Sequence, residues 1–152
     1  MATLFRNALL VQFDPPSVQQ GHLRQVDGKI VSLGNEVIAS ENDDIVDCHG
    51  AVLLPGLVNG HTHLYSALAA GLPPPPKPPR DFHEILQLIW WRLDRAHTHE
   101  SVVASGEIGA FEALRCGTTT LIDHHASPHC IDGSLDALER GIARVGCRGV
   151  LC

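Results

Sequence analysis

The stretch that decides the fold runs from Asp47 to His63 and reads DCHGAVLLPGLVNGHTH. An apolar run ends at the Pro55-Gly56 turn, and a second apolar run leads into two histidines at positions 61 and 63. Side chains at i and i+2 on a strand project to the same face, so the imidazoles of His61 and His63 can reach one metal ion. The spacing alone is a weak signal in a chain with ten histidines, because chance produces such pairs. Two histidines that merely pack at a strand end are the alternative interpretation.

The chain contains a second His-x-His, His97-Thr98-His99, which serves as an internal comparison. It lies where a helix is expected to begin, with Thr98 as the N-cap. Residues i and i+2 on a helix face away from each other, so this pair is poorly placed to chelate a metal. We expect these two histidines to be ordinary polar residues at the start of a helix.

The segment before Asp47 favours β-strands. Leu4 to Phe13 is apolar, and two short strand-like runs, His22 to Val26 and Lys29 to Leu33, are joined by Asp27-Gly28. An Asp-Gly pair between such runs is typical of a tight hairpin. We therefore expect a small antiparallel sheet in this part of the chain.

The segment after the first histidine pair alternates strands with helices. Six of the ten prolines fall between positions 73 and 79, which predicts a stiff, extended loop. Helices are expected from Phe82 to Leu93, from Thr98 to Cys116 and from Ser134 to Gly146. Strands are expected over Leu57–Leu64, over Thr118–Ile122 and from Gly149 onward. The first helix is predicted from one continuous apolar stripe, and the second strand from a β-branched, apolar run that suits burial on both faces. This order predicts a parallel sheet with helical crossovers.

The composition narrows the class of protein. The 152 residues are 44% hydrophobic and carry a net charge of −6, which suits a folded domain and argues against binding to nucleic acid or an anionic membrane. No apolar run is long enough for a transmembrane helix or an export signal. The five cysteines form no CxxC pair and are interpreted as reduced thiols, so a cytoplasmic location is expected.

Three blocks of the sequence together resemble one family. They are Gly28–Gly34, the stretch Asp47–His63 quoted above, and Gly117–Asp123. In this order and at these distances the blocks are similar to the start of enzymes of the amidohydrolase superfamily. The segments His61–Leu68 and Asp123–Pro128 are most similar to its deaminase and chlorohydrolase branch, and within that branch to the SsnA-type aminohydrolases. The resemblance covers essentially the whole chain.

The resemblance implies an α/β fold that is the N-terminal part of a (β/α)8 TIM-like barrel, preceded by part of a small β-sandwich domain. Residues 1–54 would form the sandwich part, and residues 55–152 the first two to three β/α units of the barrel. Because a whole barrel takes about 250 residues, the chain is interpreted as an N-terminal fragment. The remaining metal ligands and the proton-shuttling glutamate of the family belong to later strands, so no catalytic residue is assigned in this chain. We expect the chain alone to be inactive and prone to aggregate.

The resemblance also implies a chemistry and a set of partners. His61 and His63 would be the first two ligands of a divalent metal, Zn²⁺ in the first place with Fe²⁺ as the alternative. The metal would activate a water molecule that hydrolyses a C–N bond of a heterocyclic amine. Tyr65, His124 and His125 are candidates for substrate binding. Further partners would be the remainder of the barrel, in cis or as a second chain, and further copies of the protein, since the family is often homo-oligomeric.

Two other functions stay open on the sequence. The chain could be a non-catalytic metal-binding or interaction module that uses the same histidines, with the proline-rich loop as a docking surface. It could also be a fragment of the binuclear cyclic amidases of the same superfamily, which need a carboxylated lysine on a later strand. The chain's two lysines, Lys29 and Lys77, lie outside the expected barrel strands.

Overall fold

The computed structural model describes residues 1–152, which divide into two units, Met1–Pro55 and Gly56–Cys152. The first unit is a five-stranded sheet in which β1 (Ala2–Phe13), β2 (Pro16–Val26) and β3 (Lys29–Gly34) are antiparallel neighbours. The predicted hairpin is confirmed. Both turn residues have positive φ, 49° at Asp27 and 78° at Gly28, as the two-residue turns that match strand twist require.

The other edge of this sheet differs from the prediction of an antiparallel sheet. The short strands β4 (Asp44–Asp47) and β5 (Val52–Leu53) both pair with β1 in parallel. The loop over residues 35–43 returns the chain along the length of the strands, so β4 starts at the same end as β1. A partly buried ion pair holds this loop to the sheet, with Arg24 Nε 2.7 Å from Asp43 Oδ2.

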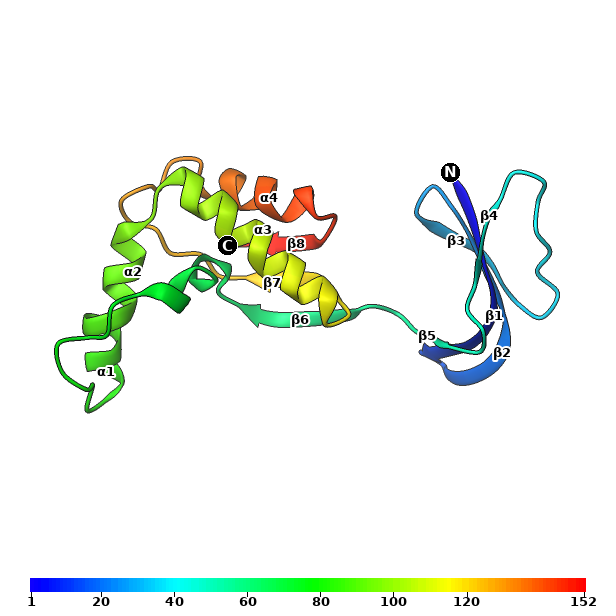
Figure 1. Cartoon of the computed structure of the whole chain (residues 1–152), viewed down its shortest axis with the longest axis horizontal. Coiled ribbons are helices and arrows are strands. Elements are labelled where there is room, and N and C mark those ends of the chain that lie inside the picture. The colour runs from blue at the N-terminus through cyan, green and yellow to red at the C-terminus, as the bar shows by residue number, and fades with distance from the viewer. The chain divides into compact units, whose positions relative to one another are not determined.

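The second unit confirms the predicted parallel sheet with helical crossovers. Its strands lie in the order β6 (Leu57–Thr62), β7 (Thr118–Asp123) and β8 (Arg148–Leu151), and both pairings are parallel. Helices α3 (His99–Arg115) and α4 (Ser134–Arg144) lie side by side over one face of this sheet (Figure 1). Thr98 caps α3 as predicted, because its side chain accepts a hydrogen bond from the backbone N–H of Ser101. None of the helices combines the length and the hydropathy that a membrane span needs.

The core of this unit lies between the two helices and the sheet. Its buried members are Leu64, Val102, Ala110, Leu121, Ala137, Leu138, Ile142 and Cys147. Glycine brings the helices into close approach: a Cβ on Gly141 of α4 would lie 2.3 Å from the carbonyl oxygen of Val103 in α3. The crossing of α3 and α4 therefore requires a residue without a side chain at this position.

The opposite face of the same sheet is exposed, so the prediction that β7 is buried on both faces is wrong. Leu121 is 1% exposed, whereas its neighbour Ile122 is 40% exposed. Val150 of β8 pairs with Ile122, and Val58 of β6 pairs with Thr120 on the same face; the two valines are 58% and 64% exposed. Successive strand residues point to opposite faces, and α3 and α4 cover only one of them.

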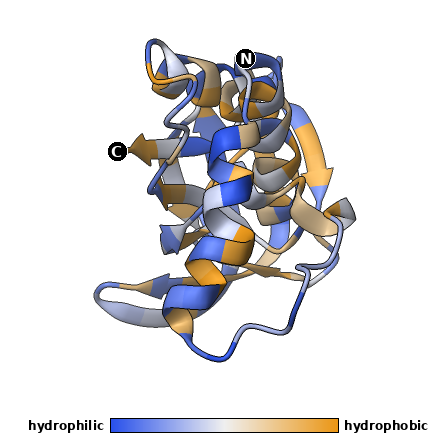
Figure 2. Ribbon diagram, turned by 90° about the vertical axis from the view of Figure 1, so that its left-hand side faces the viewer, coloured by the Kyte–Doolittle hydropathy of each residue, from blue (hydrophilic) through white to orange (hydrophobic).

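The predicted helix from Phe82 to Leu93 forms, but it contains a change of pitch. It consists of α1 (Phe82–Ile85), the π-helical segment η3 (Leu86–Trp90) and α2 (Trp91–Ala96). Figure 2 shows hydrophobic and hydrophilic residues alternating along it. The π-helical segment changes the number of residues per turn, yet the predicted apolar residues from Ile85 to Leu93 are partly or fully buried. Phe82 at its start is 70% exposed and Leu93 near its end is buried.

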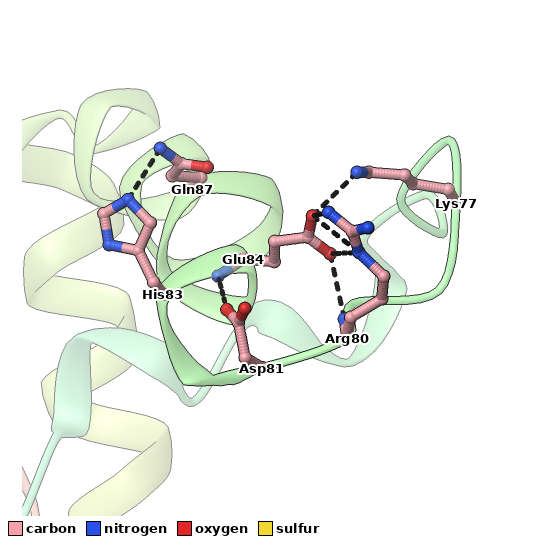
Figure 3. A network of polar contacts seen from close by, with 6 residues as sticks. All are labelled: Lys77, Arg80, Asp81, His83, Glu84 and Gln87. Carbon is pink, nitrogen blue, oxygen red and sulfur yellow. Dashed lines mark hydrogen bonds and ion pairs between the residues drawn. The ribbon is translucent and has the colours of Figure 1, made fainter.

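The proline-rich segment before this helix is anchored to it by one carboxylate (Figure 3). Glu84, only 8% exposed, accepts hydrogen bonds from Lys77 Nζ at 2.8 Å and from the Arg80 guanidinium at 2.6 Å. It also accepts one from the backbone N–H of Arg80 at 2.9 Å. Asp81 caps the helix by accepting from the backbone N–H of Glu84. The predicted extended loop is thus tied to the helix that follows it.

The close approach of the helices leads to a prediction for Gly141→Ala. Alanine favours a helix over glycine by about 1 kcal/mol, yet here its methyl group would meet backbone atoms of α3. We expect the substitution to lower the free energy of unfolding by about 2 kcal/mol or more, measured by urea denaturation. Gly71→Ala is the control, because a Cβ there meets no atom within 4 Å. Equal stability of the two variants would contradict the close crossing.

The carboxylate anchor leads to a prediction of pH dependence. The Arg80 guanidinium, followed by the Lys77 ammonium, lowers the pKa of Glu84 from 4.5 to about 2. A lowered pKa stabilises the folded state above the unfolded value and loses this contribution as the pH falls through the folded value. We expect the stability difference between the wild type and Glu84→Gln to be constant near neutral pH and to disappear between about pH 4.5 and 2. A pH-independent difference in urea midpoint would show that the charge of Glu84 has no such role.

Candidate metal centre

The first histidine pair converges at the carboxyl end of β6. The Nε2 atoms of His61 and His63 lie 3.1 Å apart, with their rings at an interplanar angle of 78°. The strand ends irregularly here, since its register with β7 shifts between Asn59 and Thr62. The Asn59 side chain accepts a hydrogen bond from the backbone N–H of His61 at 3.2 Å. The two rings therefore meet at their outer nitrogens, at the carboxyl end of β6.

This separation suits a shared metal ion. Two nitrogens that bind Zn²⁺ at about 2.0–2.1 Å in a tetrahedral site lie about 3.3 Å from each other. The 3.1 Å between the Nε2 atoms is close to that value. No group of three or more His, Cys, Asp or Glu side chains in the structure could hold a metal ion. These two histidines thus form a pair of candidate ligands without a third.

The hydrogen bond at Nδ1 of His63 leaves a lone pair on its outer nitrogen. Its Nδ1 lies 3.1 Å from the backbone carbonyl oxygen of His124. A carbonyl can only accept, so Nδ1 must carry the proton, and Nε2 of the neutral ring presents its lone pair. Metal-binding histidines commonly have their second nitrogen held in this way.

A buried aspartate holds the residues on both sides of His63. Asp123, at the end of β7, is fully buried. Its Oδ1 accepts hydrogen bonds from Thr62 Oγ1 at 2.8 Å and from the backbone N–H of Leu64 at 2.7 Å. This carboxylate joins the ends of two neighbouring strands and sets the direction of the segment that carries the histidine pair.

The three predicted substrate-binding residues lie around this segment in different environments. His124 is exposed, and its ring centroid is 5.4 Å from that of His63. His125 is half-buried, and its Nε2 lies 2.8 Å from Ser127 Oγ. Tyr65 is 5% exposed, with its ring centroid 5.9 Å from that of His63. Burial, followed by the charges of Asp94 and Asp123, raises the pKa of Tyr65 to about 12, so its phenol stays protonated at neutral pH.

Two further residues of this neighbourhood escaped the sequence reasoning. Trp90 lies with its ring centroid 6.2 Å from that of His63, because the π-helical turn directs it there. His97 is 6% exposed and its ring centroid is 5.7 Å from that of Tyr65, so the interpretation of His97 as an ordinary polar residue at a helix start is wrong. His99 does behave as expected and binds the carbonyl oxygen of Asp132 instead. The only sequence signal for His97 was its position after Leu93 and before a capped helix.

Burial shifts the pKa values of three further side chains, those of Asp94, His97 and His125. Burial lowers the pKa of His97, and the charge of Asp94 offsets part of this effect. Burial likewise lowers the pKa of His125, against the opposing charge of Asp123. For Asp94, burial raises the pKa and the nearby His97 and Arg95 oppose the shift. Both buried imidazoles are therefore neutral at neutral pH.

Comparison with known proteins identifies relatives over the whole chain. The family model described as Amidohydrolase family matches residues 52–152. The chain is 30% identical over 160 residues to a 5-methylthioadenosine/S-adenosylhomocysteine deaminase of Bacillus cereus (strain AH820), and equally to one of Bacillus anthracis (strain A0248). Each match covers 99% of this chain and 34% of the relative. The chain thus spans about a third of the length of these curated relatives.

Solved structures show the same fold. Atrazine chlorohydrolase TrzN from Arthrobacter aurescens TC1, complexed with zinc, matches with a TM-score of 0.79 at 23% identity, over 99% of this chain and 35% of the enzyme. N-isopropylammelide isopropylaminohydrolase from Burkholderia multivorans matches with a TM-score of 0.69 at 25% identity, over 99% of this chain and 37% of the enzyme.

The role of Asp123 leads to a prediction about metal affinity. Asp123→Ala removes the acceptor for Thr62 Oγ1 and for the N–H of Leu64, so His63 should lose its fixed position. We expect Zn²⁺ affinity to fall about tenfold or more, measured by an NMR titration of the histidine ring signals. Asp123→Asn keeps an acceptor oxygen of the same shape and should retain most of the affinity. If alanine and asparagine weaken binding equally, charge rather than positioning is the role of Asp123.

Proposed function

This chain belongs to the amidohydrolase family, and we propose that His61 and His63 are the first two metal ligands of an aminohydrolase that breaks a C–N bond of a heterocyclic amine. The observation that carries this proposal is the 3.1 Å approach of the two Nε2 atoms, together with the proton held on His63 Nδ1 by a carbonyl. The resemblance of the sequence to the deaminase and chlorohydrolase branch is confirmed by the relatives, which are deaminases and a chlorohydrolase. The fold class predicted from that resemblance is confirmed as well.

The metal we propose is Zn²⁺, with Fe²⁺ as the alternative. Neutral imidazole nitrogens suit either ion, and the TrzN structure is a complex with zinc. A metal in this position would act as a Lewis acid that lowers the pKa of a bound water to about 7. In the overall reaction the water oxygen bonds to the ring carbon, the C–N bond breaks, and the amine leaves with a proton as ammonia.

The chain's own residues would hold and shape this site. Asp123 and the carbonyl of His124 orient His63, as described above. Of the three candidate substrate-binding residues, His124 is the best placed to meet a ligand, because its ring is exposed beside His63. Tyr65 and His125 are more buried, which suits them to the support of the ligand segment. The proposed substrates are amino-substituted heterocycles, the class to which the relatives' named substrates belong.

The proposed partner of the chain is the remainder of the barrel, in cis or as a second chain. Strand β8 pairs with β7 on one side only, and the apolar face that carries Val58, Ile122 and Val150 is exposed. A groove of about 620 Å³ beside β8 and α4, lined by Leu135, Ile142 and Leu151 among others, could seat a following helix. Edges and faces of this kind are normally covered in folded proteins.

A metal titration tests the ligand assignment. We expect this chain alone to bind Zn²⁺ weakly, because two imidazoles are fewer than the three protein ligands of a catalytic zinc site. His61→Ala or His63→Ala should reduce the affinity at least about tenfold, measured by NMR of the histidine ring signals. His99→Ala, from the second His-x-His, is the matched control and should leave binding unchanged. Equal losses in all three variants would refute the assignment, and tight stoichiometric binding by the chain alone would favour the non-catalytic module.

Ammonia release tests the reaction. The protein supplied with the remaining barrel strands, in cis or in trans, should release ammonia from an aminopurine or aminotriazine panel. His63→Ala should abolish this release, whereas His99→Ala should not. Release by the His63→Ala protein at the wild-type rate would exclude the proposed site.

A further inference from the structure

The imidazole ring of His63 is packed on several sides by other aromatic rings. Its centroid lies 5.9 Å from that of Tyr65, 6.2 Å from that of Trp90 and 5.4 Å from that of His124. All three pairs are edge-to-face, with interplanar angles of 65°, 63° and 86°. Aromatic rings attract one another in this geometry at centroid distances of about 4.5–7 Å. Side chains from three separate segments thus meet at this one ring.

Packing against other rings is what can orient the His63 imidazole. The torsion next to an imidazole ring is broad and has no sharply preferred value, so the side chain does not aim its own ring. The hydrogen bond from Nδ1 to the carbonyl oxygen of His124 holds one point of the ring. A ring held at one point can still pivot about it. The direction of Nε2, which lies 3.1 Å from Nε2 of His61, therefore depends on the surrounding rings.

Trp90 is the ring that adds an independent support. Tyr65 is only two residues from His63, and His124 already holds it through a backbone carbonyl. Trp90 comes instead from the π-helical segment η3. Its ring also packs edge-to-face against Tyr65, with centroids 6.0 Å apart and an interplanar angle of 73°. Because Tyr65 is 5% exposed, the indole is supported by a buried neighbour while it contacts the candidate ligand.

The adjacent Trp91 provides an internal comparison. Trp90 is the last residue of η3 and Trp91 the first of α2, and both are half-buried. Consecutive residues of a helix point about 100° apart, and the ring of Trp91 packs against His83 at a centroid distance of 5.7 Å. The two tryptophans are thus alike in type, burial and position along the chain. Only the ring of Trp90 pairs with one of the two candidate ligands.

We propose that Trp90 is a positioning residue of the candidate metal centre, whose indole holds the His63 ring with its Nε2 directed toward that of His61. The proposal rests on the proposed function, because it assumes that these two histidines bind the metal. Without the indole, the His63 ring would keep its hydrogen bond at Nδ1 and pivot about it. The two Nε2 atoms would then converge in only part of the population, and the apparent metal affinity would fall by that fraction.

The first test uses the metal-free protein and no substrate. In its NMR spectra the ring protons of His63 should show nuclear Overhauser effects to the indole of Trp90 and none to that of Trp91. Trp90→Ala should shift or broaden the His63 ring signals, whereas Trp91→Ala should leave them unchanged. The His99 ring, held by the carbonyl oxygen of Asp132, is the reference that neither variant should affect. An equal response of His63 to both variants, or no contact with Trp90, overturns the proposal.

A Zn²⁺ titration measures the consequence for binding. Trp90→Ala should lower the Zn²⁺ affinity about three- to tenfold, and Trp90→Phe, which keeps a ring edge, should retain most of it. Trp91→Ala should lower the free energy of unfolding about as much as Trp90→Ala, measured by urea denaturation, and leave the affinity unchanged. If affinity follows stability in both alanine variants, the role of Trp90 is merely structural and the proposal is overturned. If Trp90→Ala does not unfold cooperatively, Trp90→Leu takes its place with the same expected loss.

The positioning role and the proposed function can fail separately. His63→Ala tests whether this histidine binds Zn²⁺, whatever holds its ring in place. If His63→Ala loses affinity and Trp90→Ala does not, only the positioning role fails. If His63→Ala binds Zn²⁺ as tightly as the wild type, the metal assignment fails and the positioning role falls with it.

Discussion

The carboxylate of Asp123 is the constraint on which the rest of the second unit depends. It stands at the end of β7, is fully buried, and accepts hydrogen bonds from the residues on either side of His63. A parallel strand pair alone fixes the direction of β6 and leaves the backbone beyond it undefined. The aspartate fixes the chain beyond the last hydrogen bond between β6 and β7, so that the imidazole of His63 turns toward His61.

Histidine has three different roles within this small region, and the partner of its second ring nitrogen decides which role each one takes. The ring of His63 is anchored by a carbonyl and presents its outer nitrogen beside that of His61. His97 and His125 are each held by a serine hydroxyl, that of Ser101 and that of Ser127. His99 donates from Nε2 to the backbone carbonyl oxygen of Asp132 and only connects two segments. The same side chain is thus a candidate ligand, a buried polar residue or a structural link according to the group that holds its other nitrogen.

Local signals in the sequence predicted the local structure well. The Asp27-Gly28 turn, the Thr98 cap and the strand that ends in His61 depend on interactions within a few residues, and all three form. The errors concern features that depend on distant residues. The parallel pairing of β4 follows from the path of a nine-residue loop, and the exposure of Ile122 follows from which face α3 and α4 cover. The pitch change at Leu86–Trp90 is invisible in the apolar spacing, yet it moves Trp90 beside His63.

The sequence by itself determined the family, the order of the elements and the histidine pair, because motif spacing along one strand already sets which side chains share a face. Only the tertiary structure decided what surrounds that pair. Asp123 is 60 residues beyond His63 in the chain and His97 is 34 beyond it, and no local pattern predicts that they lie close to the same segment. The position of the proton on His63 was likewise decided by a carbonyl group from another element. Hydrogen-bond partners that are distant in sequence therefore convert two nearby histidines into a site with a defined chemistry.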